Sequence, residues 1–178
     1  MKFYRLYAQK AEEYAVPGEA LRVLTRGCER SEFQFLNHQV LSVPLAENSG
    51  LAFPDFLCSA QIPLISDKFK RVFDDSGIDN LFYKPILLTD ETIGLRERYW
   101  LALPPRIRCL NRQASRFVED DAALPKATKI VINPSKVGNY QIFCLEEVVN
   151  RDLIVTEWLK EKIEAAHLEN VYFAELEG

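Results

Sequence analysis

The side chains that could carry out chemistry in this chain are its two histidines, its four cysteines and several neighbouring acids. A cysteine beside a histidine could act as a nucleophile, because the imidazole takes up the thiol proton. His38 lies in a strand-like stretch at 36–40, and His167 lies between a predicted helix and a predicted strand. No spacing favours a Cys/His pair, so both histidines fit structural roles. A small hydrolase or transferase that uses His38 with a cysteine or an acid remains the alternative.

The acids give no sign of a paired catalytic site. They occur at Asp74-Asp75, Asp90-Glu91, Glu119-Asp120-Asp121 and Glu146-Glu147. These positions are predicted helix ends or loops, where solvated acids are the rule. Glycosidase chemistry needs two acids that face each other across a cleft. The sequence also has no nucleophile elbow, phosphate-binding loop, dinucleotide fingerprint or zinc-helix motif, and no metal-ligand spacing. We therefore predict no catalytic, cofactor-binding or metal-binding residues and no cofactor.

Arginines form the one conspicuous charge run. Six of them fall within 21 residues: Arg96, Arg98, Arg106, Arg108, Arg112 and Arg116. With Tyr99 and Trp100, the Arg96–Arg116 segment could form a nucleic-acid surface if the basic side chains converged on one face. The net charge of −4 and the pI of about 5.3 argue against that role. The alternating arginines are instead typical of the solvated face of strands.

Negative charge is concentrated near the C-terminus. Residues 139–178 carry nine acids and three bases, whereas residues 1–138 carry 17 acids and 19 bases. This acidic quarter could face a basic partner, and the arginine run could face an acidic one. Both are equally explained as solvated surface, so the partner-binding residues are unknown at this point.

Composition bounds the class of protein. The chain has 178 residues, of which 48% are apolar and 27% charged, as in ordinary globular proteins. No apolar run reaches the ~20 residues of a membrane helix, and charge interrupts the first seven residues. We therefore expect a soluble cytoplasmic protein. Four dispersed cysteines, Cys28, Cys58, Cys109 and Cys144, predict reduced thiols rather than a disulfide framework.

Two segments, 64–86 and 154–176, align at an offset of 90 residues without a gap. Each has an apolar pair, a hydroxyl residue, an acid, a helical apolar rhythm and a closing aromatic run. Ser66 and Thr156 are typical helix N-caps, because a side-chain oxygen can accept from an unpaired N–H there. Gly77 suits the left-handed residue that ends a helix, and His167 aligns with it. The pattern predicts an internal pseudo-repeat of strand or turn, helix and strand.

Further strands are predicted at 2–7, 40–43, 98–103, 129–132 and 140–145. Pro104-Pro105 should end the third of these, since proline cannot donate to a ladder. Trp100 and Trp158 are expected to be core or half-buried. Strands grouped around two short amphipathic helices favour an α+β fold with a mixed, mainly antiparallel sheet. No composition shift marks a linker, so a single domain over 1–178 is predicted.

Several motifs of the chain resemble bacterial immunity protein family 11, long catalogued as a domain of unknown function. They are Tyr99-Trp100-Leu101, then the stretches Cys109 to Phe117 and Ile130 to Gly138, then Ile142-Phe143, with a closing segment from Leu153 to Phe173. The resemblance covers about 53–178 and leaves residues 1–50 unassigned. The chain departs from the family pattern at three positions, where Asn111 stands for the usual Asp, Cys144 for Arg and Asn170 for Gly.

The resemblance implies a function that composition and spacing do not. Family members are associated with polymorphic-toxin, contact-dependent and type VI secretion systems. It therefore implies a cytosolic antitoxin that binds a cognate effector toxin and holds it inactive. The resemblance implies no catalytic residue.

Overall fold

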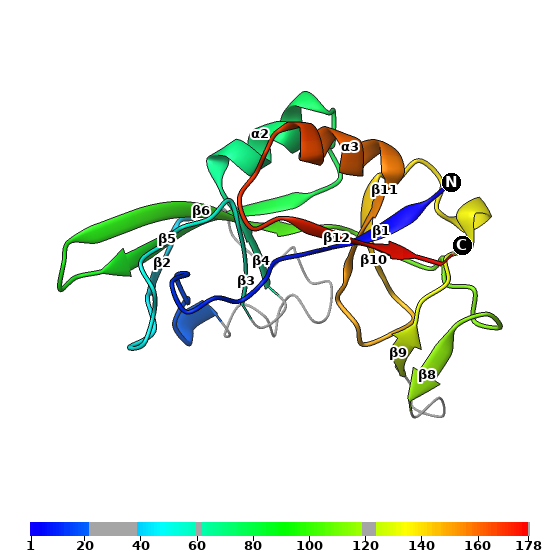
Figure 1. Ribbon diagram of the computed structural model, residues 1–178, viewed down its shortest axis with the longest axis horizontal. Helices are drawn as coiled ribbons and strands as arrows, with labels where there is room; N and C mark the ends of the chain where they lie inside the picture. The colour runs from blue at the N-terminus through cyan, green and yellow to red at the C-terminus, as the bar shows by residue number, and fades with distance from the viewer. Residues whose placement is uncertain (22–38, 60–61, 119–123, 178) are drawn as a thin grey trace. The chain divides into compact units, whose positions relative to one another are not determined.

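The computed structural model describes residues 1–21, 39–59, 62–118 and 124–177. Its contacts divide the chain into two compact units (Figure 1). Unit 1 comprises Met1–Tyr7, Pro104–Ala165 and Tyr172–Gly178, and unit 2 comprises Ala8–Leu103 and Ala166–Val171. Strands grouped around two short helices confirm the predicted α+β class. The single domain over 1–178 remains a prediction.

Unit 1 contains a five-stranded sheet in the order β12-β1-β11-β10-β7. The strands are β1 (Phe3–Tyr7), β7 (Arg106–Ile107), β10 (Ile142–Leu145), β11 (Leu153–Thr156) and β12 (Tyr172–Leu176). The N-terminal strand β1 is antiparallel to both β11 and β12, and only the β10–β7 pair is parallel. Phe3 pairs with Leu176, so the first and last strands lie side by side and both chain ends lie at this sheet (Figure 1).

Unit 1 also contains a small hairpin and a 3₁₀ helix. The hairpin pairs β8 (Arg116–Val118) with β9 (Lys126–Lys129), and the 3₁₀ helix η2 is Pro134–Lys136. The strand predicted at 129–132 is therefore misplaced, since β9 ends where it was expected to begin. Val131 and Ile132 instead form isolated bridges with Glu177 and Leu110.

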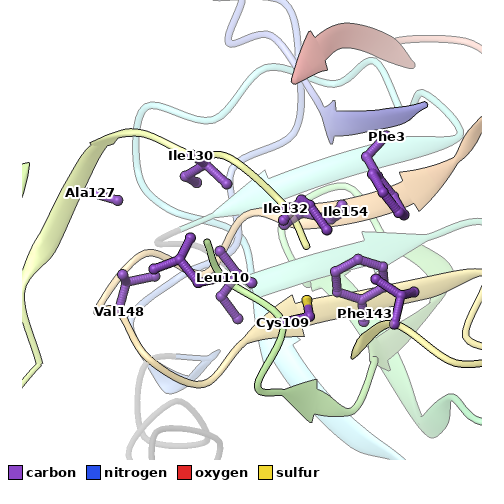
Figure 2. Packing of buried hydrophobic residues seen from close by; sticks show 11 residues of the cluster. Phe3, Cys109, Leu110, Ala127, Ile130, Ile132, Phe143, Val148 and Ile154 are labelled. Carbon is purple, nitrogen blue, oxygen red and sulfur yellow. The ribbon is translucent and has the colours of Figure 1, made fainter. Parts of the chain in front are cut away.

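The core of unit 1 contains residues of the sheet together with residues of the segment 109–137, which precedes β10. Figure 2 shows Phe3 of β1 beside Phe143 of β10, with their ring centroids 6.0 Å apart in an edge-to-face arrangement. Ile154 lies beside them and is fully buried. The rest of the buried cluster is Cys109, Leu110, Ala127, Ile130, Ile132, Val137, Leu145 and Val148.

Unit 2 contains a second five-stranded sheet in the order β2-β5-β6-β4-β3. The strands are β2 (Leu41–Pro44), β3 (Phe56–Ser59), β4 (Ile62–Ile65), β5 (Phe82–Asp90) and β6 (Leu95–Leu103). The long β5–β6 pair is an antiparallel hairpin, and only β2 is parallel to its neighbour. As predicted, β6 ends at the residue before Pro104.

The core of unit 2 lies against one face of this sheet and includes the segment before β2. Its buried residues are Ala15, Leu21, Val43, Leu57, Ile62, Leu64, Ile86, Leu88, Tyr99 and Leu101. Gly50 permits the close approach that holds this segment, because a Cβ atom there would lie 2.1 Å from the backbone carbonyl of Glu13. The isolated bridge between Tyr14 and Ala52 holds the same two stretches of chain together.

The two helices begin as predicted. In α2 (Asp67–Asp75) the Oγ of Ser66 accepts from the Phe69 amide at 3.1 Å. In α3 (Glu157–Ala165) the Oγ1 of Thr156 accepts from the Leu159 amide at 3.4 Å. Leu159 and Phe69 are both fully buried, so each helix packs the same face onto its own sheet.

The ends of the two helices also correspond. Gly77 has φ +67° and His167 has φ +48°, so both positions adopt the left-handed conformation. Glycine takes this conformation at no steric cost, whereas a histidine there is strained. Each helix is followed by a strand, β5 or β12, as the sequence pattern predicts. The internal pseudo-repeat of 64–86 and 154–176 remains a prediction.

Candidate functional site

Of the two histidines, only His167 lies in the described part of the chain. His167 is exposed, and its backbone carbonyl accepts from the Nζ of Lys68 at 3.0 Å. Its backbone has the left-handed conformation, which gives His167 a structural role in the turn between α3 and β12. His38, the base of the alternative enzyme hypothesis, lies outside the described residues, as does Cys28.

Cys109 and Cys144 are unfavourable as nucleophiles. Cys109 and Cys144 are buried, and Cys58 is half-buried. Burial raises the pKa of Cys109 to about 12, and the nearby carboxylate of Glu147 adds to the rise. Burial likewise raises the pKa of Cys144 to about 12. Since only the thiolate is strongly nucleophilic, both groups are inert at neutral pH.

The arginine run does not form one continuous feature of the fold. Arg96 and Arg98 belong to unit 2, and the other four arginines belong to unit 1. Arg106 is half-buried and donates to the carbonyls of Leu145 and Val148 at 3.0–3.2 Å. Arg108 forms an exposed ion pair with Glu146 at 2.8 Å. These contacts assign part of the run to structure rather than to a nucleic-acid surface.

A polar cluster lies at the start of α2. The carboxylate of Asp67 accepts from the Trp100 indole Nε1 at 2.6 Å and forms an ion pair with Arg98. Burial by itself raises the pKa of Asp67, but the hydrogen bonds from Arg98 and Trp100 outweigh it and hold the pKa below its ordinary value. This arrangement fixes β6 to α2 and leaves Trp100 half-buried, as predicted.

The position of Trp158 differs from the prediction. Trp158 lies on α3 with 43% of its surface exposed, rather than in the core. The apolar face of α3 is filled by Leu159 and Ile163, both within 1% of full burial, so the neighbouring residue at 158 projects away from the sheet. The Nζ of Lys162 lies 5.9 Å from the centroid of the Trp158 ring. An exposed, oriented indole is the kind of side chain that anchors protein interfaces.

The helix that carries this indole also exposes acidic side chains. Glu157 and Glu161 are exposed on the same helix, as is Glu164 one turn further on. When charges are counted for each unit, however, their distribution differs from the distribution along the sequence. Unit 1 carries 11 acids and 12 bases, whereas unit 2 carries 15 acids and 10 bases. The acidic C-terminal quarter is therefore nearly neutralised by the rest of unit 1, and negative charge persists locally on α3.

The described ranges contain no cluster of three or more His, Cys, Asp or Glu side chains that could hold a metal ion. In the same ranges, no helix has the length and apolar character needed to span a membrane.

The model of the immunity protein family Imm11 matches residues 10–178. It confirms the resemblance inferred from the sequence motifs and extends it over most of the first fifty residues, which those motifs leave unassigned. No curated protein matches the chain.

Proposed function

This chain belongs to the Imm11 immunity protein family, and we propose that it binds a cognate effector toxin and neutralises it by occlusion, without catalysis. The observation that carries the proposal is the extent of the match, from residue 10 to residue 178. Because the match covers both units, the immunity role is proposed for the whole chain and not for one part of it.

The structure is compatible with occlusion. A protein that blocks another by contact needs a stable surface of defined shape and charge, and no reactive group. Each unit has a five-stranded sheet with a buried apolar cluster, so it can present its surface side chains in fixed positions. The buried thiols Cys109 and Cys144 and the structural role of His167 support a binding protein over an enzyme.

We place this function in the cytoplasm, where an immunity protein would meet an effector made by the same cell or delivered by a sibling. A polymorphic toxin of a contact-dependent or type VI secretion system is the proposed partner. Two sequence-based alternatives have less support. The enzyme hypothesis depends on His38, outside the described residues, and the nucleic-acid hypothesis depends on arginines that are divided between the units.

The test has two stages. The tagged full chain is incubated with lysate of its native cells and washed at moderate and high salt, and bound proteins are identified by mass spectrometry. Each recovered effector is then expressed with and without the chain. We expect one stoichiometric effector that survives high salt, is toxic alone and is harmless with the chain. Recovery of nucleic acid that is lost at high salt, or of no protein whose toxicity the chain relieves, would overturn the proposal.

A further inference from the structure

The two helices can be compared position by position, because their structural contacts correspond. The Oγ of Ser66 donates to the Asp55 carboxylate and the Oγ1 of Thr156 donates to the Gln141 side chain, each at 2.5 Å. The backbone amides of Ser66 and Thr156 donate to the carbonyls of these same two residues at 2.9 and 3.0 Å. Each helix therefore follows a strand that is held at its end in the same way.

The correspondence extends to the neighbouring strand. Ile65, before α2, pairs with Trp100, and Val155, before α3, pairs with Tyr4. Trp100 donates to the first acid of α2, and the Tyr4 hydroxyl donates to Glu157, the first acid of α3, at 3.5 Å. The helix positions that face the sheet, and the first acid of each helix, thus carry equivalent side chains in equivalent contacts.

Four positions outside the buried face do not follow this rule. Lys68 of α2 corresponds to Trp158 of α3, and Arg71 corresponds to Glu161, at the constant offset of 90. All four residues are exposed. At these two positions, positive charges on α2 are replaced on α3 by an indole and a negative charge, whereas Lys162 places a positive charge on α3 where α2 has Val72. Since α2 packs onto its sheet with a lysine at the position that corresponds to Trp158, the contacts of such a helix do not require a tryptophan.

An exposed indole without a structural role carries a cost in solubility and is enriched where proteins bind one another. The Nζ of Lys162 lies 5.9 Å from the centroid of the Trp158 ring, within the range of a cation–π contact. Glu157 and Glu161 flank the ring with negative charge. A complementary surface would combine an apolar recess for the indole with basic side chains around it.

We propose that the outer face of α3, formed by Glu157, Trp158 and Glu161, is the surface that contacts the toxin. Its partner is a basic face of the toxin with a recess that receives the indole. This inference rests on the proposed function and names its interface.

The experiment uses the full chain and the effector recovered as above. Trp158→Lys introduces the residue type that α2 carries at the corresponding position, and Glu161→Arg reverses the charge. We expect each substitution to weaken toxin binding at least about 10-fold, as for an interface anchor, with an unchanged thermal unfolding midpoint. Affinity of the natural chain should also fall with added salt, and the Glu161→Arg chain should lose part of that dependence.

Two matched variants serve as controls. Tyr140→Lys removes another exposed aromatic of unit 1, 40% exposed and outside α3. Arg71→Glu reverses charge at the corresponding position of α2. Both should leave the affinity within about two-fold of the natural chain. If the natural chain binds the toxin and Trp158→Lys binds it equally well, the α3 surface is wrong and the immunity function stands. If the natural chain relieves the toxicity of no recovered effector, the proposed function itself fails.

Discussion

Lys160 occupies in α3 the position that Lys70 occupies in α2. Each ammonium group forms an ion pair at 2.6 Å with the acid four residues later, Glu164 or Asp74. The Nζ of Lys70 also lies 4.5 Å and 5.4 Å from the ring centroids of Tyr83 and Trp100. The Nζ of Lys160 lies 5.1 Å and 5.4 Å from those of Tyr4 and Phe173. In both units a lysine thus joins the outer side of a helix to two strands beneath it.

Replacement of either lysine should weaken its unit slightly. Lys160→Met keeps the alkyl stem and removes the ion pair and both ring contacts, which together contribute about 1 kcal/mol. We expect Lys70→Met to have a similar effect, because its contacts correspond. Urea unfolding of the full chain measures both, with Lys10→Met at an exposed position as the control. A loss above about 3 kcal/mol would contradict the surface character of these contacts.

Loss of a helix cap should reduce the free energy of unfolding more than loss of either lysine. Thr156→Ala removes the oxygen that accepts from the Leu159 amide and the hydroxyl that donates to Gln141. We expect a loss of about 1–2 kcal/mol in the free energy of unfolding, and Ser66→Ala should lose a comparable amount. Thr156→Ser keeps the hydroxyl and should retain most of the stability. Hydrogen exchange should show faster exchange at the first turn of the affected helix, and equal exchange in all variants would refute the capping role.

Acid should weaken the contact between Asp67 and its partners. The pKa of Asp67 is lowered in the folded chain, so its carboxylate stabilises the fold above the unfolded value of about 3.9. That contribution is lost as the pH falls through the lower folded pKa. The difference in unfolding midpoint between the natural chain and Asp67→Asn should therefore be constant above about pH 5 and shrink in stronger acid.

Arg98→Gln provides the complementary measurement. It removes the ion-pair partner, so the folded pKa of Asp67 should rise, and the acid-induced loss should be smaller and should be complete at a higher pH. Midpoints recorded from pH 3 to pH 7 distinguish the three chains. If the natural chain and Asp67→Asn lose stability in parallel over this range, Asp67 does not contribute as described.

Thiol labelling should distinguish the buried cysteines from Cys58 by their rates of reaction. Cys109 and Cys144 are buried with pKa values raised to about 12, so neither should react with an alkylating reagent at pH 8 in the native chain. Half-buried Cys58 should react faster than both. Peptide mapping by mass spectrometry identifies the labelled residue, and labelling in urea should modify all three. Rapid native labelling of Cys109 or Cys144 would show that the core of unit 1 opens readily.

The N-terminal strand should be essential to unit 1. Phe3 is 1% exposed and packs edge-to-face on Phe143, so Phe3→Ala should lose about 3–5 kcal/mol in the free energy of unfolding. Val118→Ala, at a site that is 48% exposed, should change it by less than about 0.5 kcal/mol. Chemical denaturation measures both, and hydrogen exchange should report the loss in β11 and β12. Protection of these strands in Phe3→Ala equal to that of the natural chain would contradict the central position of β1.

Local features of the fold were predictable from the sequence. The starts of both helices, the left-handed residues at Gly77 and His167, and the end of β6 before Pro104 follow from hydrogen bonding and sterics within a few residues. The apolar faces of α2 and α3 follow from the helical period. The strand expected at 129–132 was misplaced because Val131 and Ile132 meet their partners only as isolated bridges.

Long-range relationships required the tertiary structure. Nothing near Phe3 indicates that it pairs with Thr156 on one side and Leu176 on the other, because strand partners are chosen by the burial of whole faces. The division of the arginine run between units likewise depends on which distant segments pack together. A residue type and its spacing determine which local conformation is favoured, whereas the packing of distant segments determines which side chains remain at the surface to meet a partner.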